Sequence, residues 1–165
     1  LGLKDVVFLG YPDGYLEPTL EVRKDISREI RRWKPDVLIA SNPTRDLSSS
    51  EYLGHPDHFA AGEATLSAVF PSARDHLTFP ELVNDEGLEP HKVREVWVMS
   101  FGLDANFWNP LEEQDVDTSI AALAKHASQV GNPEESAKWM KQRRADLGKR
   151  ISANYAESFR KFTLG

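Results

Sequence analysis

Two histidines and a carboxylate stand within four residues of one another in the segment Gly54-His55-Pro56-Asp57-His58. Imidazole nitrogens and carboxylate oxygens ligate zinc, and they also serve as general acids and bases in hydrolysis. Pro56 suits the first position of a helix, so His55 is predicted as the N-cap and His58 as a residue of the first turn. Residues three apart share a helix face, so we expect the two imidazoles to lie together.

The start of a helix favours metal binding by these side chains. The positive end of the helix dipole disfavours imidazolium, and neutral imidazole is the form that ligates zinc. Asp57 suits the same dipole and is close enough in sequence to orient one histidine. A capped helix with two exposed histidines is the competing interpretation. Two histidines are also too few for a catalytic zinc, which takes three protein ligands and keeps one position open.

The remaining candidates are scattered. His76 and His91 fall in an irregular segment and are expected to face solvent, whereas His126 lies beside the inward stripe of a helix and could line a pocket. Asp13 follows a predicted strand, where it either forms a turn or accepts a hydrogen bond from a substrate hydroxyl.

The elements that position these residues alternate between strand and helix. An apolar run at 6–9 predicts a buried strand, the stripe in 20–34 predicts a helix, and 36–40 predicts a second buried strand. Together they form a βαβ unit, which implies a parallel sheet. The helix that begins at Pro56 follows the polar segment 41–53, at the carboxyl edge of that sheet, where α/β proteins bind ligands.

The second half of the chain continues the α/β pattern. An irregular segment over 71–92 precedes a third strand at 93–100 and a loop at 101–115. Two helices are expected to finish the chain. The first covers about 117–129, and the second opens at Asn132-Pro133 and runs through Phe159. Its predicted inward face has residues four apart, which are Trp139, Arg143 (by its stem), Leu147, Ile151, Tyr155 and Phe159. We interpret residues 1–165 as a single α/β domain.

The composition excludes several classes of protein. The 165 residues carry a net charge of −6, which is unlike the basic surface of a nucleic-acid-binding protein. No apolar run is long enough to span a membrane, and no signal sequence opens the chain, so a cytoplasmic protein is expected. The chain has no cysteine, so a transition metal must bind to His, Asp or Glu.

Six stretches in order resemble one known family: Phe8-Leu9-Gly10-Tyr11-Pro12-Asp13-Gly14, Lys34-Pro35-Asp36-Val37, Gly54-His55-Pro56-Asp57-His58, Met99-Ser100-Phe101, His126-Ala127-Ser128-Gln129 and Phe159-Arg160-Lys161-Phe162-Thr163-Leu164. This order is similar to that of the PIG-L/LmbE-like zinc-dependent N-acetylglucosaminyl deacetylases. The resemblance covers nearly the whole chain. It implies a Rossmann-like three-layer α/β sandwich with a mostly parallel sheet.

The family's site suggests roles for individual residues. In the family, the second histidine of the His-Pro-Asp-His motif ligates zinc, which implies this role for His58. The first, resembled by His55, would stabilise the oxyanion or act as a general acid, with Asp57 orienting it. Three further residues would contact an amino-sugar substrate: Asp13, Tyr52 and His126. The implied enzyme is a hydrolase that removes an N-acetyl or other N-acyl group with a metal-activated water.

One family motif has no counterpart. A His-Pro-Asp-Asp segment supplies the other zinc ligands and the general base, and in the family it follows the first strand. We therefore expect a βα unit and those ligands upstream of Leu1, and expect the 165-residue chain by itself to bind Zn²⁺ weakly and to be inactive. The alternatives are a non-catalytic carbohydrate-binding or regulatory module and, less favoured, another metallohydrolase that uses Asp46 or Asp104. A homo-oligomer is left open.

Overall fold

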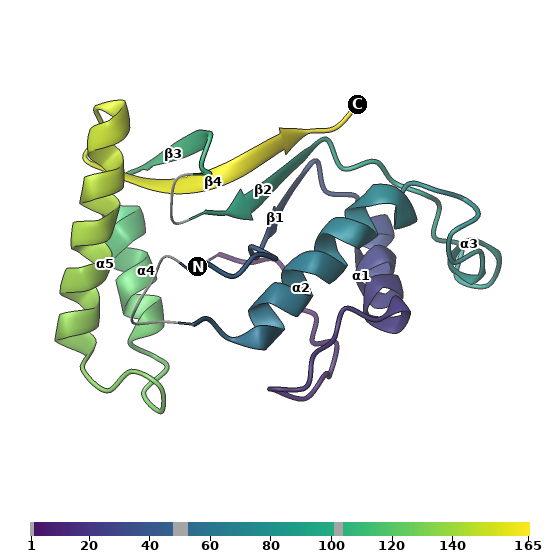
Figure 1. Ribbon diagram of the computed structural model, residues 1–165, viewed down its shortest axis with the longest axis horizontal. Coiled ribbons are helices and arrows are strands. Elements are labelled where there is room, and N and C mark those ends of the chain that lie inside the picture. Colours follow the sequence, from purple (N-terminus) through teal and green to yellow (C-terminus); the bar gives the residue numbers. More distant parts are fainter. Residues whose placement is uncertain (1, 48–52, 101–103) are drawn as a thin grey trace. The chain divides into compact units, whose positions relative to one another are not determined.

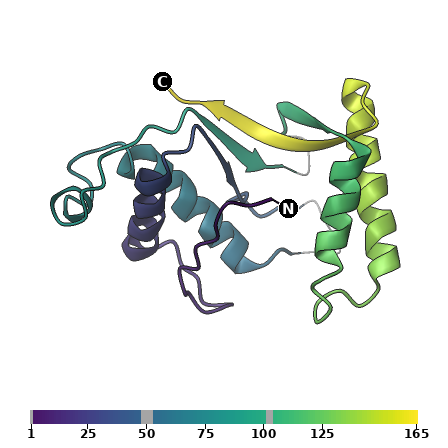
Figure 2. The same cartoon turned by 180° about the vertical axis from the view of Figure 1, so that it is seen from behind.

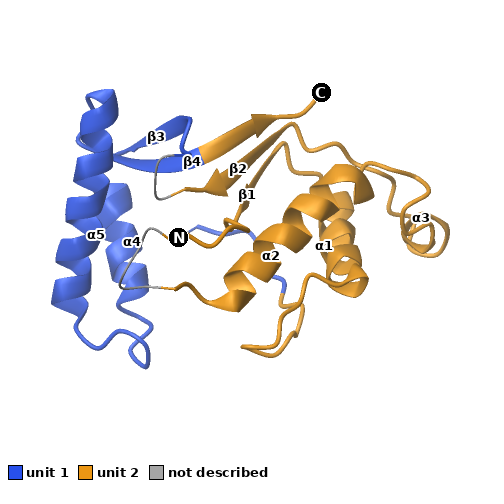
Figure 3. Cartoon of the chain, in the orientation of Figure 1, with its two compact units in different colours: residues 1–7, 101–159 blue, residues 8–100, 160–165 orange. Residues whose placement is uncertain are grey.

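The computed structural model describes residues 2–47, 53–100 and 104–165. The chain is divided into two compact units (Figure 3). Unit 1 comprises residues 1–7 and 101–159, and unit 2 comprises residues 8–100 and 160–165. The prediction of a single domain over 1–165 stays a prediction. Among the described residues, no helix combines the length and the apolar composition needed to cross a bilayer.

Unit 2 alternates helices and strands. In chain order it contains α1 (Leu20–Trp33), β1 (Val37–Ala40), α2 (Pro56–Ser67), an irregular helical turn (Ala68–Ser72), α3 (Glu81–Asn84) and β2 (Glu95–Met99). Helix α1 begins after Thr19, whose side chain accepts a hydrogen bond from the Val22 N–H, and ends at Lys34 in a left-handed conformation. Figures 1 and 2 show α1 and α2 side by side.

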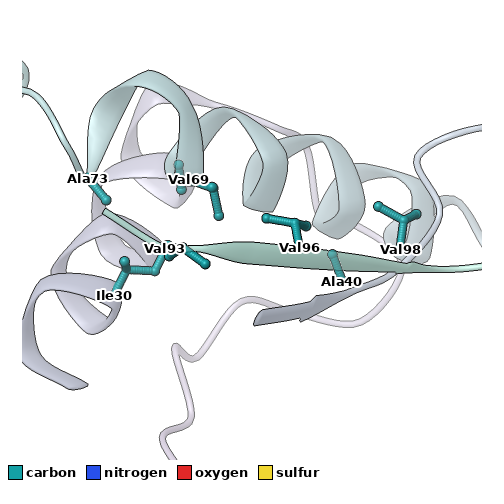
Figure 4. Packing of buried hydrophobic residues seen from close by; sticks show 8 residues of the cluster. Ile30, Ala40, Val69, Ala73, Val93, Val96 and Val98 are labelled. Atoms are coloured by element: carbon teal, nitrogen blue, oxygen red, sulfur yellow. The ribbon is translucent and has the colours of Figure 1, made fainter. Parts of the chain in front are cut away.

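The core of unit 2 lies on one face of a parallel strand pair. Val37 of β1 pairs with Glu95 of β2, and the register continues to Ala40 opposite Val98. Figure 4 shows the buried residues that pack here, which are Ile30, Ala40, Ala68, Val69, Ala73, Val93, Val96 and Val98. Because side chains alternate along a strand, Ile39 of β1 points to the opposite face and is 56% exposed.

A buried arginine organises the irregular segment of unit 2. The Arg31 side chain is fully buried, and burial lowers its pKa. Its guanidinium donates hydrogen bonds to the carbonyl oxygens of Ser72, Ala73, Asp75, Thr78 and Leu88. A segment without regular ladders thus satisfies its buried carbonyl groups through one side chain.

The predicted strand at 6–9 is absent from the structure. These residues are irregular, and all four apolar side chains are exposed, with Phe8 at 90%. A four-residue apolar run becomes a strand only when a neighbouring strand bonds its backbone, and no described strand does so here. The observed parallel connection therefore runs from β1 to β2.

Unit 1 contains β3 (Phe107–Leu111), α4 (Glu113–Leu123), α5 (Pro133–Gly148) and the first part of β4 (Tyr155–Thr163). Strands β3 and β4 are antiparallel, with Phe107 opposite Phe159 and Leu111 opposite Tyr155. Helix α5 begins as predicted, because Asn132 accepts a hydrogen bond from the Glu135 N–H and Pro133 follows.

The predicted end of that helix is wrong. Helix α5 stops at Gly148, Lys149–Ile151 forms a short 3-10 turn, and the residues from Tyr155 to Phe159 belong to β4. A side chain at Gly148 would lie 2.6 Å from the carbonyl oxygen of Ala153, so the chain folds back tightly after the helix. Ser152 adopts a left-handed conformation at this reversal. The four-residue spacing of apolar residues suggested a helix, but β-forming side chains pack there as a strand.

The predicted inward face of the same helix is wrong at two positions. Trp139 and Ile151 were predicted to point inward, but both side chains are exposed, Trp139 at 60%. Helix α5 makes its contacts through another face, where Lys141 pairs with Glu113 of α4 and Arg144 pairs with Glu157 of β4.

The four strands have the order β1-β2-β4-β3. The sheet combines a parallel pair with an antiparallel one, so the predicted mostly parallel sheet is wrong. The α/β class is confirmed, whereas the Rossmann-like three-layer arrangement stays a prediction. In unit 2, the end of β4 meets the start of β2, where the Leu164 N–H donates to the Arg94 carbonyl and Lys161 pairs with Glu95.

Candidate active site

The predicted cap at the start of α2 is confirmed. His55 has extended backbone angles, and its Nδ1 accepts a hydrogen bond of 3.3 Å from the Asp57 N–H. Pro56 occupies the first helical position. Since Nδ1 is an acceptor, the neutral ring carries its proton on Nε2. His55 therefore presents an N–H donor to whatever lies beyond Nε2.

Asp57 joins α2 to the turn that follows the N-terminal apolar segment. Its Oδ2 accepts a hydrogen bond of 2.8 Å from the Gly14 N–H. Its Oδ1 is buried and has no hydrogen-bond partner among the described residues. That atom lies 3.7 Å from Nδ1 of His55, beyond hydrogen-bond length, so the backbone of Asp57 and not its carboxylate contacts the ring.

Asp13 completes a small cluster around His55. One carboxylate oxygen of Asp13 lies 3.9 Å from Nε2 of His55, and the Asp13 side chain is exposed. Asp13, His55 and Asp57 each offer one ligand atom, and these atoms lie within 4.8 Å of one another. The turn supplies the Asp13 carboxylate near Nε2 and α2 supplies the Asp57 carboxylate near Nδ1, a donor set that suits a divalent cation.

The turn that carries Asp13 is tied to α1 by a residue that the sequence did not single out for this role. The Tyr11 hydroxyl donates a 2.7 Å hydrogen bond to Asp25, which also accepts one from Arg28. Arg28 in turn binds Glu86. Burial and the bond to Asp25 raise the pKa of Tyr11 to about 12.

The pKa of Asp25 reflects the same contacts. Burial alone would raise it, but the hydrogen bonds from Tyr11 and Arg28 outweigh burial and lower it. Tyr11 and Asp25 are too far apart in sequence for a local pattern to join them. The sequence signal available for this contact was the position of Tyr11 beside the turn.

The loop before His55 is held by Arg45. Its guanidinium donates to the carbonyl oxygens of Leu53 and Gly54 and lies 4.6 Å from the centre of the Phe59 ring. Gly54 has φ +76°, and a Cβ there would lie 2.4 Å from the Phe59 ring. The left-handed conformation therefore favours glycine, and a Cβ at this position would force the outer end of the Phe59 ring to shift.

A second glycine brings α2 close to the loop after β1. A Cβ on Gly62 would meet the carbonyl oxygen of Ser41 at 2.5 Å and the nitrogen of Pro43 at 2.9 Å. Because both neighbours are backbone atoms, only glycine permits this approach. Gly62 thus fixes the helix that presents His55 at its N-terminus.

His58 lies near the cluster but outside it. Its ring centre is 5.8 Å from that of His55, as expected for two residues of one helical turn. The His58 side chain is exposed, and it is not one of the three residues whose ligand atoms meet within 4.8 Å. Its role as a zinc ligand stays a prediction.

The other predicted residues are placed differently. His126 is exposed in unit 1, whereas the cluster belongs to unit 2, and Tyr52 lies outside the described residues. His76 is exposed as predicted. The prediction for His91 is wrong, because it is half-buried with Nε2 2.8 Å from the Pro35 carbonyl oxygen.

The alternative ligands Asp46 and Asp104 are not part of the cluster either. The three residues that the structure does bring together all belong to the first 69 residues of the chain.

An α/β fold with a histidine between two carboxylates at a helix start has the groups of a metal-assisted hydrolase. Residues 1–69 match the PIG-L family, described as GlcNAc-PI de-N-acetylase. The resemblance inferred from the sequence is therefore confirmed, and the matched stretch contains Asp13, His55 and Asp57.

Individual relatives are deacetylases. The chain is 33% identical over 96 residues to a diacetylchitobiose deacetylase of Thermococcus kodakarensis, and this match covers 58% of the chain and 33% of that protein. An N,N'-diacetylchitobiose deacetylase of Pyrococcus horikoshii, solved with its inhibitor MPG, matches 98% of the chain and 58% of its own, at 25% identity and a TM-score of 0.81.

A conserved protein of Thermus thermophilus has a similar structure. The TM-score is 0.70 and the identity 26%, over 92% of the chain and 62% of that protein. The matches thus span between one third and about three fifths of the length of these relatives.

Proposed function

We propose that this chain provides part of the active site of a metal-dependent deacetylase that acts on N-acetylated amino sugars. The observation that carries the proposal is the convergence of Asp13, His55 and Asp57 within 4.8 Å, inside the stretch that matches the family. The named activity of the relatives from T. kodakarensis and P. horikoshii supports an amino-sugar substrate.

The residues present fit a metal. Oδ1 of Asp57 is a buried carboxylate atom without a hydrogen-bond partner among the described residues, which is unfavourable unless a cation or a donor completes it. His58 is the proposed zinc ligand, and Asp57 is the adjacent carboxylate. When bound, zinc would polarise the acyl carbonyl and activate water. The chain has only nitrogen and oxygen donors to offer, which zinc accepts.

His55 would act on the substrate through Nε2. Deacetylation adds water to the acyl carbon, breaks the C–N bond and releases acetate and a free amine. Negative charge develops on the carbonyl oxygen, and the Nε2–H of His55 would donate a hydrogen bond to it. The ring would supply a proton to the leaving amine only as imidazolium, because a neutral imidazole cannot give up its single N–H proton. In the neutral ring, Nδ1 accepts the cap bond from the Asp57 N–H, and this leaves the donor at Nε2.

Asp13 would position the sugar or His55. Its exposed carboxylate lies 3.9 Å from Nε2 of His55, so it can accept a hydrogen bond from a sugar hydroxyl that enters beside the ring. The Gly14 N–H bond to Asp57 fixes the turn, and with it the separation of Asp13 from His55. Substrate and histidine would thus be aligned by one turn.

The test combines metal binding with product release. Zinc bound per chain is measured by calorimetry, and acetate release from N,N'-diacetylchitobiose is measured with and without chelator. We expect zinc binding that is weakened in His58→Ala, whose ring lies 5.8 Å from that of His55, and in Asp57→Asn. The control His76→Ala should leave zinc binding unchanged, because His76 is an exposed residue of the irregular segment that follows α2. A chain that binds the saccharide but neither binds zinc nor releases acetate would favour a non-catalytic carbohydrate-binding module. Zinc binding that is equal in all variants would contradict the site.

A further inference from the structure

The turn that carries Asp13 is held at both ends by the two helices beside the candidate site. At its start, the Tyr11 hydroxyl donates a 2.7 Å hydrogen bond to Oδ2 of Asp25 in α1. At its end, the Gly14 N–H donates a 2.8 Å hydrogen bond to Oδ2 of Asp57 in α2. Asp13 lies between these two attachments, so its position depends on both.

The attachment to α1 extends to the irregular segment of unit 2. Oδ1 of Asp25 accepts a 2.5 Å hydrogen bond from Arg28, one helical turn further along α1. Nε of Arg28 donates to both carboxylate oxygens of Glu86, at 3.0 and 2.8 Å. These three side chains keep only between 24 and 33% of their surface exposed, so their charge-assisted bonds are partly protected from water. We call Tyr11, Asp25, Arg28 and Glu86 the turn anchor.

Hydrogen bonds, and not packing, determine where the turn lies. Residues 12–15 are exposed, and a Cβ added to Gly14 would meet nothing within 4 Å. While the Gly14 N–H occupies Oδ2 of Asp57, the carboxylate is fixed in rotation, and Oδ1 is the buried oxygen without a partner among the described residues. Without the Tyr11 bond the turn would be attached at one end only, and Gly14 could withdraw from Asp57.

We propose that the four residues of the turn anchor are positioning residues of the candidate site. They hold the turn so that the Gly14 N–H orients the Asp57 carboxylate toward a metal ion. The inference rests on the proposed function, which gives that orientation its purpose. The four residues do not belong to the ligand cluster and act through Gly14 and Asp57. The site thereby includes a contribution from Glu86, a residue that no sequence motif connects with it.

The first test needs no metal. The amide proton of Gly14 in the 165-residue chain is followed by NMR, because a hydrogen bond to a carboxylate polarises the N–H and moves its signal downfield. Asp57→Ala shows where the signal lies when the bond is absent. Tyr11→Phe and Glu86→Gln should each move the signal toward that value, and Tyr11→Phe should move it further because the hydroxyl makes the direct contact.

The second test is the affinity for Co²⁺, whose visible absorption reports coordination at a site with nitrogen and oxygen donors. We expect Tyr11→Phe to raise the dissociation constant about three- to tenfold and Glu86→Gln to raise it less. The double variant should bind Co²⁺ about as well as Tyr11→Phe alone, because both changes act through the same attachment of the turn.

Each variant has a matched control. Glu81→Gln removes the same charge from the same segment, where Glu81 pairs with Lys24 of α1 at 3.3 Å outside the turn anchor. It should lower the free energy of unfolding about as much as Glu86→Gln does, yet leave the Gly14 signal and the Co²⁺ affinity unchanged. Tyr15→Phe makes the same chemical change as Tyr11→Phe, in the same turn but on an exposed side chain, and should likewise change neither.

A Gly14 signal that stays in place in Tyr11→Phe and Glu86→Gln would overturn the proposal. A Co²⁺ affinity that falls equally in Glu81→Gln and Glu86→Gln would also overturn it, because the turn anchor would then act only through general stability. A wild-type chain that binds no Co²⁺ would contradict the proposed function instead, and the Gly14 signal would still decide whether the turn anchor holds the turn.

Discussion

Replacing Gly54 with alanine should destabilise the chain in two separable ways. Gly54 has φ +76°, a conformation that costs an L-residue roughly 1–2 kcal/mol. The added Cβ would also lie 2.4 Å from Cζ of Phe59, so that the ring must move by about 1 Å to reach ordinary contact at 3.4 Å. Moving the ring disturbs the Arg45 contact, which contributes about 0.5–1 kcal/mol at an exposed site.

Overpacking typically adds about 1–3 kcal/mol. The total for Gly54→Ala is therefore roughly 2–5 kcal/mol, of which the Phe59 collision contributes about 1–3 kcal/mol. Gly87→Ala isolates the conformational part, because Gly87 has φ +67° and an added Cβ would meet nothing within 4 Å. That variant should lose only the conformational part, roughly 1–2 kcal/mol.

The assay is urea unfolding of both variants, followed by circular dichroism. Phe59→Leu supplies a second comparison, because leucine lacks the atoms that an alanine at position 54 would strike. In that background Gly54→Ala should cost about as little as Gly87→Ala. Equal losses for Gly54→Ala and Gly87→Ala in the wild-type background would refute the reasoning, and so would an excess that persists beside Leu.

Three further outcomes follow from contacts described above. Gly62→Ala should destabilise by about 2–4 kcal/mol in urea unfolding and should lower metal affinity, since the new Cβ meets backbone of Ser41 that cannot move aside. Arg31→Met should cost about 3–5 kcal/mol, because buried carbonyl groups lose their donors, whereas Arg32→Met at an exposed position should change little. Tyr11→Phe should destabilise by about 1 kcal/mol near neutral pH. Because the pKa of Tyr11 is raised from 10.0 to about 12, the contribution of its hydroxyl to the free energy of unfolding is complete below pH 10 and is lost as the pH rises toward 12. The stability difference between wild type and Tyr11→Phe should therefore shrink over that range.

Local chemistry predicted the parts of the fold that depend on local contacts. Asn132 caps α5 and His55 caps α2, as predicted, because a cap needs only a side chain and the N–H two or three residues later. Strands were less predictable. The apolar run beginning at Val6 has the composition of a strand but pairs with no described strand. Phe159 ends a series of residues spaced four apart, as in a helix, but it lies in β4.

The candidate site was predictable in composition but not in geometry. The sequence and the family resemblance grouped His55, Asp57, His58, Asp13, Tyr52 and His126 in one site. The structure brings His55, Asp57 and Asp13 together, whereas the roles of these six residues stay predictions. The sequence could not show that the Asp57 carboxylate accepts a hydrogen bond from the Gly14 N–H and does not bond to the His55 ring. That contact depends on how the turn packs against α2. The anchor of the turn at Tyr11 was missed for the same reason.

The buried guanidinium of Arg31 should make the chain more resistant to proteolytic cleavage. Residues 72–88 contain the breakers and exposed polar positions that usually invite cleavage. Five carbonyl groups of this stretch share one cation, so no single peptide bond can be released to enter a protease cleft without disturbing the others. We expect limited proteolysis to spare these residues until the unit unfolds as a whole. We also expect their amide exchange to be faster when the Arg31 side chain of α1 is replaced.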